Sequence, residues 1–258
     1  MTISSEKRDK IMCITLNRPE ALNALAPEDM DGLRKALIGF REDPDAWVCI
    51  LTGAGEKAFC TGADMIKAVG QDLEASGASR DSTNFYYGYH GLNIWKPIIG
   101  AINGYCLAGG LAIALLCDIR ICSENAIFGT VGTSRGIMPA GGQTQRLPRV
   151  IPLAKALELF FTAENIGAQE AYRIGLVNRV VSQAELMNSA WEMAEKIARN
   201  APIAIAASKQ ACIKGLDLPL DQGIKLEVDL GMKLISTEDA SEGISAFKER
   251  RKPQFKGK

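Results

Sequence analysis

The sequence has a single histidine, no CxxC pair and no excess of charge of either sign. Thirty lysines and arginines balance thirty aspartates and glutamates over 258 residues, and no block of like charge stands out. A face that binds nucleic acid needs clustered basic residues. The composition therefore disfavours RNA or DNA as a partner and favours a small molecule.

The sequence also lacks a long hydrophobic run. The longest, near 111–117, is too short to span a bilayer, and the start MTISSEKRDK has no apolar signal-peptide segment. Seven cysteines are scattered singly, mostly within apolar stretches, which is typical of reduced, packed thiols. We expect a cytoplasmic protein with no membrane partner and no metal site.

The first two-thirds of the chain alternate short apolar runs with helical patterns. IMCITL (11–16) and WVCILTG (47–53) are β-branched runs on either side of a helical segment, and PIIGAINGY (97–105) begins a second such unit. After Pro152 helical periodicity dominates, with one short strand at 175–181. The pattern predicts an α/β core followed by a helical layer.

Two glycine-rich turns follow predicted strands, GEKAFCTGADM (55–65) and NGYCLAGGLAIALL (103–116). Gly109 and Gly110 open an apolar helix, so their N–H groups are unpaired and lie at the positive end of the helix dipole. Such donors suit an anion or a developing oxyanion, although a glycine pair also permits close helix packing. Neither turn matches GxGxxG or GxxxxGK[ST], so we expect no nucleotide cradle of those types.

Six segments, in order along nearly the whole chain, resemble the crotonase, or enoyl-CoA hydratase/isomerase, superfamily. They are ITLNRPEALNAL (14–25), VCILTGAGEKAFCTGADM (48–65), KPIIGAINGYCLAGGLAIALLCDI (96–119), GIMPAGGQTQRLPR (136–149), AYRIGLVNRVV (171–181) and SEGISAFKERRKPQF (241–255). The resemblance implies an α/β fold: a spiral of β-β-α turns over 1–195 that binds the acyl-CoA, and a C-terminal helical trimerisation region over 196–258. It also implies a homotrimer or homohexamer.

The resemblance further implies a coenzyme A thioester as substrate, with no cofactor beyond that CoA moiety. The thioester carbonyl oxygen would accept hydrogen bonds from the backbone N–H groups of Ala63 and Gly109, which would form an oxyanion hole. The motifs place further residues along the thioester and its CoA: Arg18, Ala21, Ala24, Asp64, Met65, Ile66, Gly110 and Lys248. For the basic members of this set, an ordinary solvated charge is the alternative.

Two positions depart from the hydratase pattern. Family hydratases add water with two glutamates, and the corresponding residues here are Ala112 and Gly132. The FGTVG segment instead resembles that of dihydroxynaphthoyl-CoA synthases, in which a bound bicarbonate can replace the missing carboxylate. The matching residues are Thr130 and Gly132, whereas Pro139 stands where that branch has an aspartate. We expect a poor hydratase, with a bound anion such as bicarbonate near Gly132 as a hypothesis.

Other ionisable residues are candidates for proton transfer or substrate binding. His90 follows three tyrosines in a segment that borders the acyl pocket in this family, and an imidazole is a natural general base, although a helical histidine among tyrosines more often has a packing or surface role. Arg135 could hold a substrate carboxylate or point to solvent. Asp118 and Glu124 are interpreted as structural.

The sequence therefore predicts an acyl-CoA lyase or isomerase that stabilises a thioester enolate. The alternatives are a decarboxylase or C–C bond hydrolase or synthase resembling dihydroxynaphthoyl-CoA synthase, and a non-catalytic acyl-CoA-binding protein.

Overall fold

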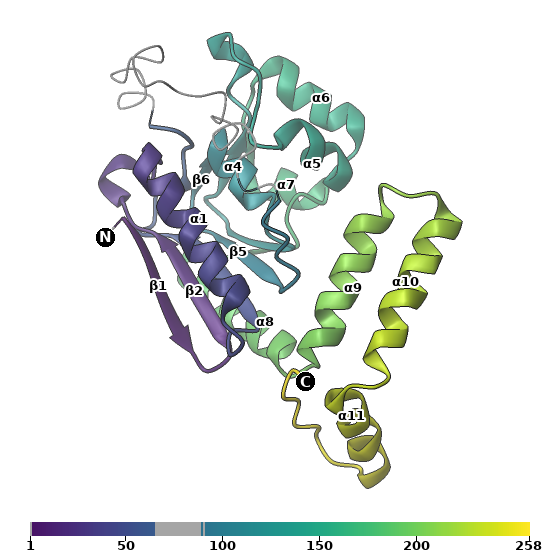
Figure 1. Cartoon of the computed structure of the whole chain (residues 1–258). Helices are drawn as coiled ribbons and strands as arrows, with labels where there is room; N and C mark the ends of the chain where they lie inside the picture. Colours follow the sequence, from purple (N-terminus) through teal and green to yellow (C-terminus); the bar gives the residue numbers. More distant parts are fainter. Residues whose placement is uncertain (1, 65–88, 90) are drawn as a thin grey trace.

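The larger of two β-sheets forms the centre of the protein (Figure 1). The computed structural model describes residues 2–64, 89 and 91–258. The six strands of this sheet run in the order β1-β2-β3-β5-β7-β10; β1 is antiparallel to β2 and the others are parallel. Their bounds are β1 Ile3–Arg8, β2 Ile11–Leu16, β3 Val48–Gly53, β5 Ile98–Ile102, β7 Ile119–Ser123 and β10 Arg179–Val181.

The smaller sheet is built from the strands that follow those of the larger one. Its order is β4-β6-β8-β9, with β9 antiparallel to β8. The bounds are β4 Ala58–Cys60, β6 Tyr105–Leu107, β8 Ile127–Gly129 and β9 Ile166–Gly167. The chain thus passes from β3 to β4, from β5 to β6 and from β7 to β8, each time leaving the large sheet for the small one. This repetition is the expected spiral.

Helices cover both faces of the large sheet. α1 (Pro27–Glu42) buries Leu33, Leu37 and Phe40 at helical spacing and packs against β1 and β2. α8 (Leu186–Ala198) packs against β3, β5 and β7 and forms a second core cluster. The other helices of this part are η1 Pro19–Ala21, α4 Gly109–Ala114, η2 Thr133–Arg135, α5 Gln143–Val150, α6 Leu153–Thr162, α7 Ala168–Arg173 and η3 Gln183–Glu185.

The last three helices project from this core. α9 (Pro202–Gly215) and α10 (Leu220–Leu234) lie side by side, and α11 (Glu238–Glu249) follows them (Figure 1). Lys209 of α9 donates to the Asp118 carboxylate over 2.8 Å, and this carboxylate also accepts from the Ile98 N–H. These contacts give Asp118 a structural role. The proposed boundary at residue 196 stays a prediction.

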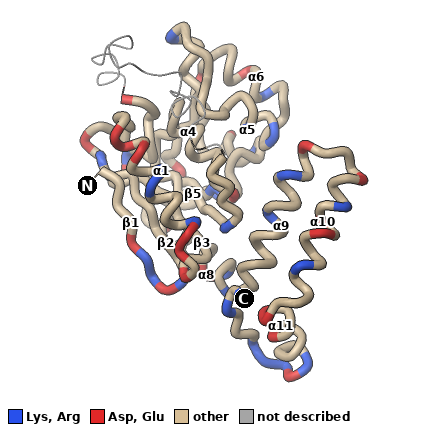
Figure 2. The backbone as a smooth tube through the Cα atoms, in the orientation of Figure 1, with Lys and Arg blue, Asp and Glu red and all other residues tan. Residues whose placement is uncertain are grey.

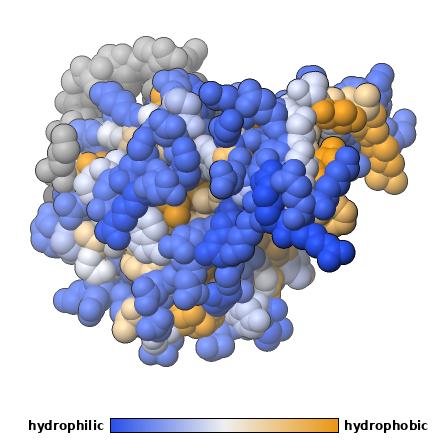
Figure 3. All heavy atoms as spheres, turned by 90° about the horizontal axis from the view of Figure 1, so that it is seen from below, coloured by the Kyte–Doolittle hydropathy of each residue, from blue (hydrophilic) through white to orange (hydrophobic). Residues whose placement is uncertain are grey.

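The projecting helices expose a stripe of apolar side chains. On α10 the exposed members recur about every fourth residue, and Figure 3 shows apolar patches on the projecting part of the molecule. They are Leu220, Ile224, Val228 and Met232. A contiguous exposed apolar surface of this kind marks an interaction site.

Charge and cysteine placement follow the composition. Figure 2 shows basic and acidic residues interspersed along the described chain. All seven cysteines are free; six are buried and Cys212, on α9, is exposed. No helix in the described part of the chain has the length and hydropathy to cross a membrane.

Candidate active site

The turn after β4 leaves one backbone N–H group without an acceptor. Ala63 forms a parallel bridge with Leu25, in which the Leu25 N–H donates to Gly62 O over 2.8 Å and the Asp64 N–H donates to Leu25 O over 2.9 Å. In such a bridge the residue between the two bonds directs its own N–H away from the partner strand. Within the described residues, the Ala63 N–H therefore has no hydrogen-bond partner.

The turn after β6 provides a second donor, the Gly109 N–H, which has no partner in the part of the chain that the structure describes. Gly109 is the first residue of α4, so its N–H cannot bond within the helix. The preceding residue, Ala108, has φ 49° and ψ −118°, a conformation that favours glycine. The Ala108 N–H donates to Gly129 O over 2.9 Å, which fixes this turn to β8.

Glycines allow the two turns to approach closely. A Cβ atom on Gly62 would lie 2.8 Å from the Gly109 nitrogen, and one on Gly109 would lie 3.6 Å from the Ala63 nitrogen. A Cβ on Gly110 would overlap the carbonyl group of Cys60. The structure therefore brings Ala63 and Gly109 together as the sequence predicts, with Gly110 packed beneath them.

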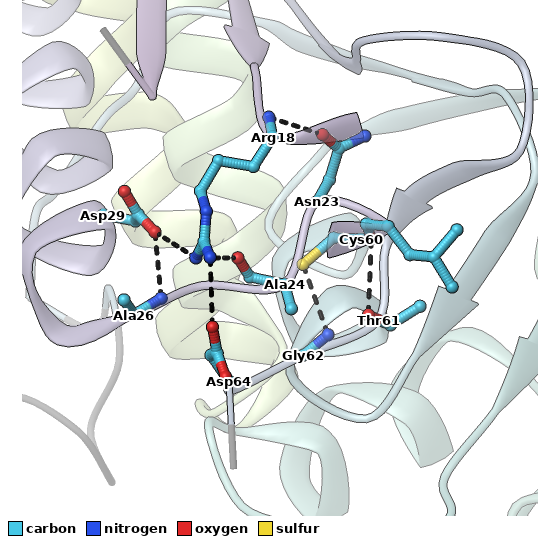
Figure 4. A network of polar contacts seen from close by, with 10 residues as sticks. Arg18, Asn23, Ala24, Ala26, Asp29, Cys60, Thr61, Gly62 and Asp64 are labelled. Carbon is cyan, nitrogen blue, oxygen red and sulfur yellow. Dashed lines mark hydrogen bonds and ion pairs between the residues drawn. The ribbon is translucent and has the colours of Figure 1, made fainter. Parts of the chain in front are cut away.

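An ion-pair network supports the Ala63 turn (Figure 4). The Arg18 guanidinium donates to Asp29 over 2.9 Å, to Asp64 over 3.1 Å and to the Ala24 carbonyl over 2.9 Å. Asp29 also accepts from the Ala26 N–H, which closes the start of α1. Arg18, expected at the CoA phosphates, thus links the 18–26 segment to the turn that carries Ala63.

Two buried asparagines that the sequence reading did not single out hold the same region. Asn23 donates to the carbonyls of Ala54 and Ala58 over 3.0 and 2.7 Å. Asn103 donates to the Gly53 carbonyl over 2.9 Å and also contacts Gly55 and Ala58. Asn103 directly follows β5 in an NGY sequence, and this position after an apolar run is the signal that could have identified it, whereas Asn23 follows η1 and has no such signal.

The two free N–H groups border a cavity of about 410 Å³. Its described lining is mostly apolar and comes from α1, from the two turns and from the segment after β8. The lining includes Leu25, Met30, Ala63, Tyr89, Gly109, Ala112, Ile113, Val131, Gly132, Ile137, Met138 and Pro139. A cavity of this size and composition, with a few convergent polar groups, is typical of a small-molecule site.

Ala112 and Gly132, the two positions where glutamates were expected from the family pattern, both lie on the cavity wall. A Cβ on Gly132 would lie 2.9 Å from the Ile137 carbonyl oxygen and 3.3 Å from the Pro139 nitrogen. Backbone atoms therefore occupy the direction in which a side chain at position 132 would extend. The described lining offers no carboxylate at either position.

The ionisable groups on the described lining are Asp31, Arg34, Tyr89 and Arg135. Asp31 is exposed and forms a 2.7 Å ion pair with Lys35. Burial raises the pKa of the Tyr89 phenol, so it stays neutral near pH 7. Arg34 was not identified from the sequence, because its position on a helix looks like an ordinary solvated charge.

The other predicted site residues lie in different surroundings. Ala21 and Ala24 are half-buried next to Arg18. Thr130 is buried, and its hydroxyl donates to the Leu159 carbonyl over 2.9 Å. Lys248 is on α11, in the projecting part of the chain. Met65, Ile66 and His90 lie outside the described residues.

Neither a thiol nor a metal cluster adds to the described site. Cys60 lies directly before the Ala63 turn and accepts a hydrogen bond from the Gly62 N–H at 3.4 Å. Burial raises the pKa of the Cys60 thiol to about 12, which makes it a poor nucleophile near pH 7. Among the described residues, no group of three His, Cys, Asp or Glu side chains could hold a metal ion.

Comparison with known proteins identifies the family of the chain. The model of the enoyl-CoA hydratase/isomerase family matches residues 6–258. An (E)-benzylidenesuccinyl-CoA hydratase of Thauera aromatica is 45% identical over 258 residues, which is 100% of both chains. A short-chain-enoyl-CoA hydratase of Clostridium acetobutylicum is 41% identical over 254 residues, with 96% of this chain and 94% of the relative covered.

A solved structure has the same fold. The 1.8 Å crystal structure of an enoyl-CoA hydratase from Bacillus anthracis superposes with a TM-score of 0.94 at 39% identity and covers 100% of both chains. The expected spiral α/β fold is thereby confirmed. From its family match, its relatives and its fold, the chain belongs to the enoyl-CoA hydratase/isomerase family and is an enzyme of that family.

Proposed function

We propose that the protein binds an acyl-CoA thioester and stabilises its enolate with the backbone N–H groups of Ala63 and Gly109. The observation that carries this proposal is the pair of unpaired donors at the wall of an apolar cavity. Donors fixed in advance toward a developing negative charge are worth about 2.7–4 kcal/mol of barrier each. The donors need no side chain, so any reaction that passes through the enolate is served by them.

Hydration of a simple enoyl thioester is slow in this proposal. A general acid or base contributes roughly 10²–10⁴-fold to the rate, and Ala112 and Gly132 supply neither. His90 is the candidate general base in this proposal. Decarboxylation and C–C bond cleavage, by contrast, depend mainly on enolate stabilisation, so a decarboxylase or a C–C bond hydrolase or synthase is the alternative to a slow enoyl-CoA hydratase or isomerase. A bound anion such as bicarbonate would lie in the open cavity, because backbone atoms fill the Cβ direction of Gly132.

The CoA moiety runs along Ala21, Ala24 and Asp64 and continues past Met65 and Ile66. Arg18 contributes by holding this segment through Asp29 and Asp64. Gly110 allows its turn to pack against the Cys60 carbonyl, and the hydrogen bond from the Thr130 hydroxyl to the Leu159 carbonyl holds the segment that carries Gly132.

The protein assembles as a homotrimer or homohexamer in this proposal. The exposed apolar stripe of α10 supports it, because an exposed apolar surface of this kind marks a protein–protein interaction site. In such an assembly, Lys248 of α11 binds a CoA phosphate. The buried free thiols favour a cytoplasmic location.

The proposal is tested by absorbance of crotonyl-CoA with purified protein, together with calorimetric binding of butyryl-CoA. The relative from Thauera aromatica is named for a benzylidenesuccinyl thioester, so aryl and dicarboxylyl thioesters belong in the same survey. We expect binding with slow hydration of crotonyl-CoA and faster turnover of another acyl class. Rapid crotonyl-CoA hydration would refute the poor-hydratase part, whereas binding without turnover of any class would identify an acyl-CoA-binding protein.

A further inference from the structure

We infer that Arg34 and Arg135 form an anion subsite in the acyl pocket that binds a carboxylate carried by the acyl group. This inference rests on the proposed function, because it assigns the substrate class of the same cavity. Both side chains line the cavity that also contains Ala63 and Gly109. They reach it from separate elements, Arg34 from α1 and Arg135 from η2.

Arg34 is a half-buried cation without a carboxylate in the described structure. It follows the buried Leu33 on α1, and no ion pair or hydrogen bond of its guanidinium occurs among the described residues. The carboxylate of Asp31, almost one turn earlier on α1, forms a 2.7 Å ion pair with Lys35. A guanidinium that is partly withdrawn from water is stabilised by an anion, and a bound ligand can provide it.

Arg135 is the last residue of η2, the short turn that directly follows Gly132. Its backbone N–H donates to the Gly132 carbonyl over 2.9 Å, and Gly136 with φ +71° ends the turn. The side chain therefore starts one short turn from position 132. The Arg135 side chain is exposed, and within the described residues it has no ion pair. The cavity wall, which has no carboxylate at Gly132, therefore has a cation three residues further along the chain, at Arg135.

The chemistry of the cavity favours a carboxylate on the acyl group. The remaining described lining is mostly apolar, with Met30, Ile113 and Val131 among it, so a charged acyl group would otherwise lose solvation without compensation. The guanidinium fork binds a carboxylate through two parallel hydrogen bonds. CoA phosphates offer the same chemistry, but the two arginines share the cavity of the oxyanion donors, where the thioester carbonyl is bound.

The test measures calorimetric dissociation constants for two acyl groups on two carriers. Butyryl and glutaryl thioesters are saturated and differ in one terminal carboxylate. Each is prepared with CoA and with pantetheine, which lacks the phosphates. The proteins are the wild type, Arg34→Gln, Arg135→Gln, the double variant and the control Arg149→Gln. Arg149 is on α5, and its exposed side chain forms a 3.2 Å ion pair with Asp217.

We expect the wild type to bind glutaryl thioesters more tightly than butyryl thioesters by roughly 10- to 100-fold, on both carriers. Each single variant reduces this preference, the double variant abolishes it, and Arg149→Gln retains it. Unchanged butyryl affinity shows that the variants are folded and that the oxyanion site is intact. Equal wild-type affinity for both acyl groups would overturn the inference.

A second result would also overturn it. If the arginine variants weakened both CoA thioesters equally and left both pantetheine thioesters unchanged, the arginines would bind CoA phosphates. Failure of the wild type to bind any thioester would refute the proposed function itself, and the inference with it. The two failures are distinguishable by the butyryl-CoA titration alone.

Discussion

A Cβ atom on Gly62 would lie 2.8 Å from the backbone nitrogen of Gly109, so the two turns that carry the proposed oxyanion donors approach more closely than a side chain at position 62 would allow. We expect Gly62→Ala to separate the donors, and its φ of +96° adds backbone strain. Turnover of the best thioester should fall by roughly 10²–10³-fold, measured as kcat/KM. Gly39→Ala on α1, where nothing lies within 4 Å, should leave kcat/KM unchanged.

The conformation of Ala108 predicts a stabilising substitution. Its φ of 49° and ψ of −118° suit glycine, which has no Cβ to strain. Ala108→Gly should raise the free energy of unfolding by about 1 kcal/mol, measured by urea titration. Thioester affinity should stay within twofold, since the Gly109 N–H keeps its direction. A loss of stability in this variant would contradict the assigned strain.

Gly132 is required by the close approach of the following turn. Gly132→Ala should lower the free energy of unfolding by about 1–3 kcal/mol, because its Cβ would lie 2.9 Å from the Ile137 carbonyl oxygen. Gly132→Glu should be at least as destabilising and should not restore hydration of crotonyl-CoA. Gly167→Ala, with nothing within 4 Å, is the matched control. Equal stability of the Gly132→Ala and Gly167→Ala variants would show that the turn adapts.

The Asp29 carboxylate makes part of the stability depend on pH. Burial alone would raise the pKa of Asp29, but the nearby Thr2 side chain and hydrogen bonds from the Ala26 N–H and the Arg18 guanidinium outweigh it, and its pKa lies below the ordinary value. A lowered pKa in the folded state means that the stabilisation is present above about pH 3.9, the unfolded pKa, and is lost as pH falls through the folded pKa.

We therefore expect Asp29→Asn to be less stable than the wild type at pH 7, with the gap narrowing below about pH 4. Urea titrations between pH 7 and pH 3 measure this. Asp45→Asn, which removes an exposed carboxylate 3.5 Å from Lys10, should show a small gap throughout. A gap for Asp29→Asn that widens toward low pH would contradict the sign.

The exposed stripe on α10 predicts the effect of a single charge on assembly. Val228 is 53% exposed in the isolated chain and lies in the middle of the stripe. Val228→Glu should reduce the molar mass measured by light scattering from that of the oligomer toward that of one chain, because a buried charge is costly. Lys225→Glu, on the same helix but outside the stripe, should leave the mass unchanged. A wild type that is already monomeric would refute the assembly.

The sequence predicts most of the local elements but not how they divide between sheets. The run 11–16 matches β2 and the run 47–53 matches β3 to within one residue. The run 97–105, expected as one strand, is split into β5 and β6. The reason is tertiary, because Gly104 approaches the backbone of Lys57 so closely that a Cβ there would overlap it.

The helix start at Gly109 was predictable from the sequence, and the long-range contacts that hold the proposed donors in place were not. Unpaired N–H groups at Gly109 follow from a helix start, which is a local property. The partners of Arg18 are 11 and 46 residues away, and those of Asn103 are backbone carbonyls brought near by the spiral. Neither periodicity nor composition specifies such long-range contacts.

Because both donors at the cavity are main-chain N–H groups, alanine scanning would not detect them. Ala63 is already alanine, and Gly109 has no side chain to remove. A scan of the chain would identify residues such as Arg18, Asn103 and Gly62, which act by keeping the backbone in place. The two N–H donors are better detected by ¹⁵N chemical shifts on thioester binding, or by replacing single peptide bonds with esters.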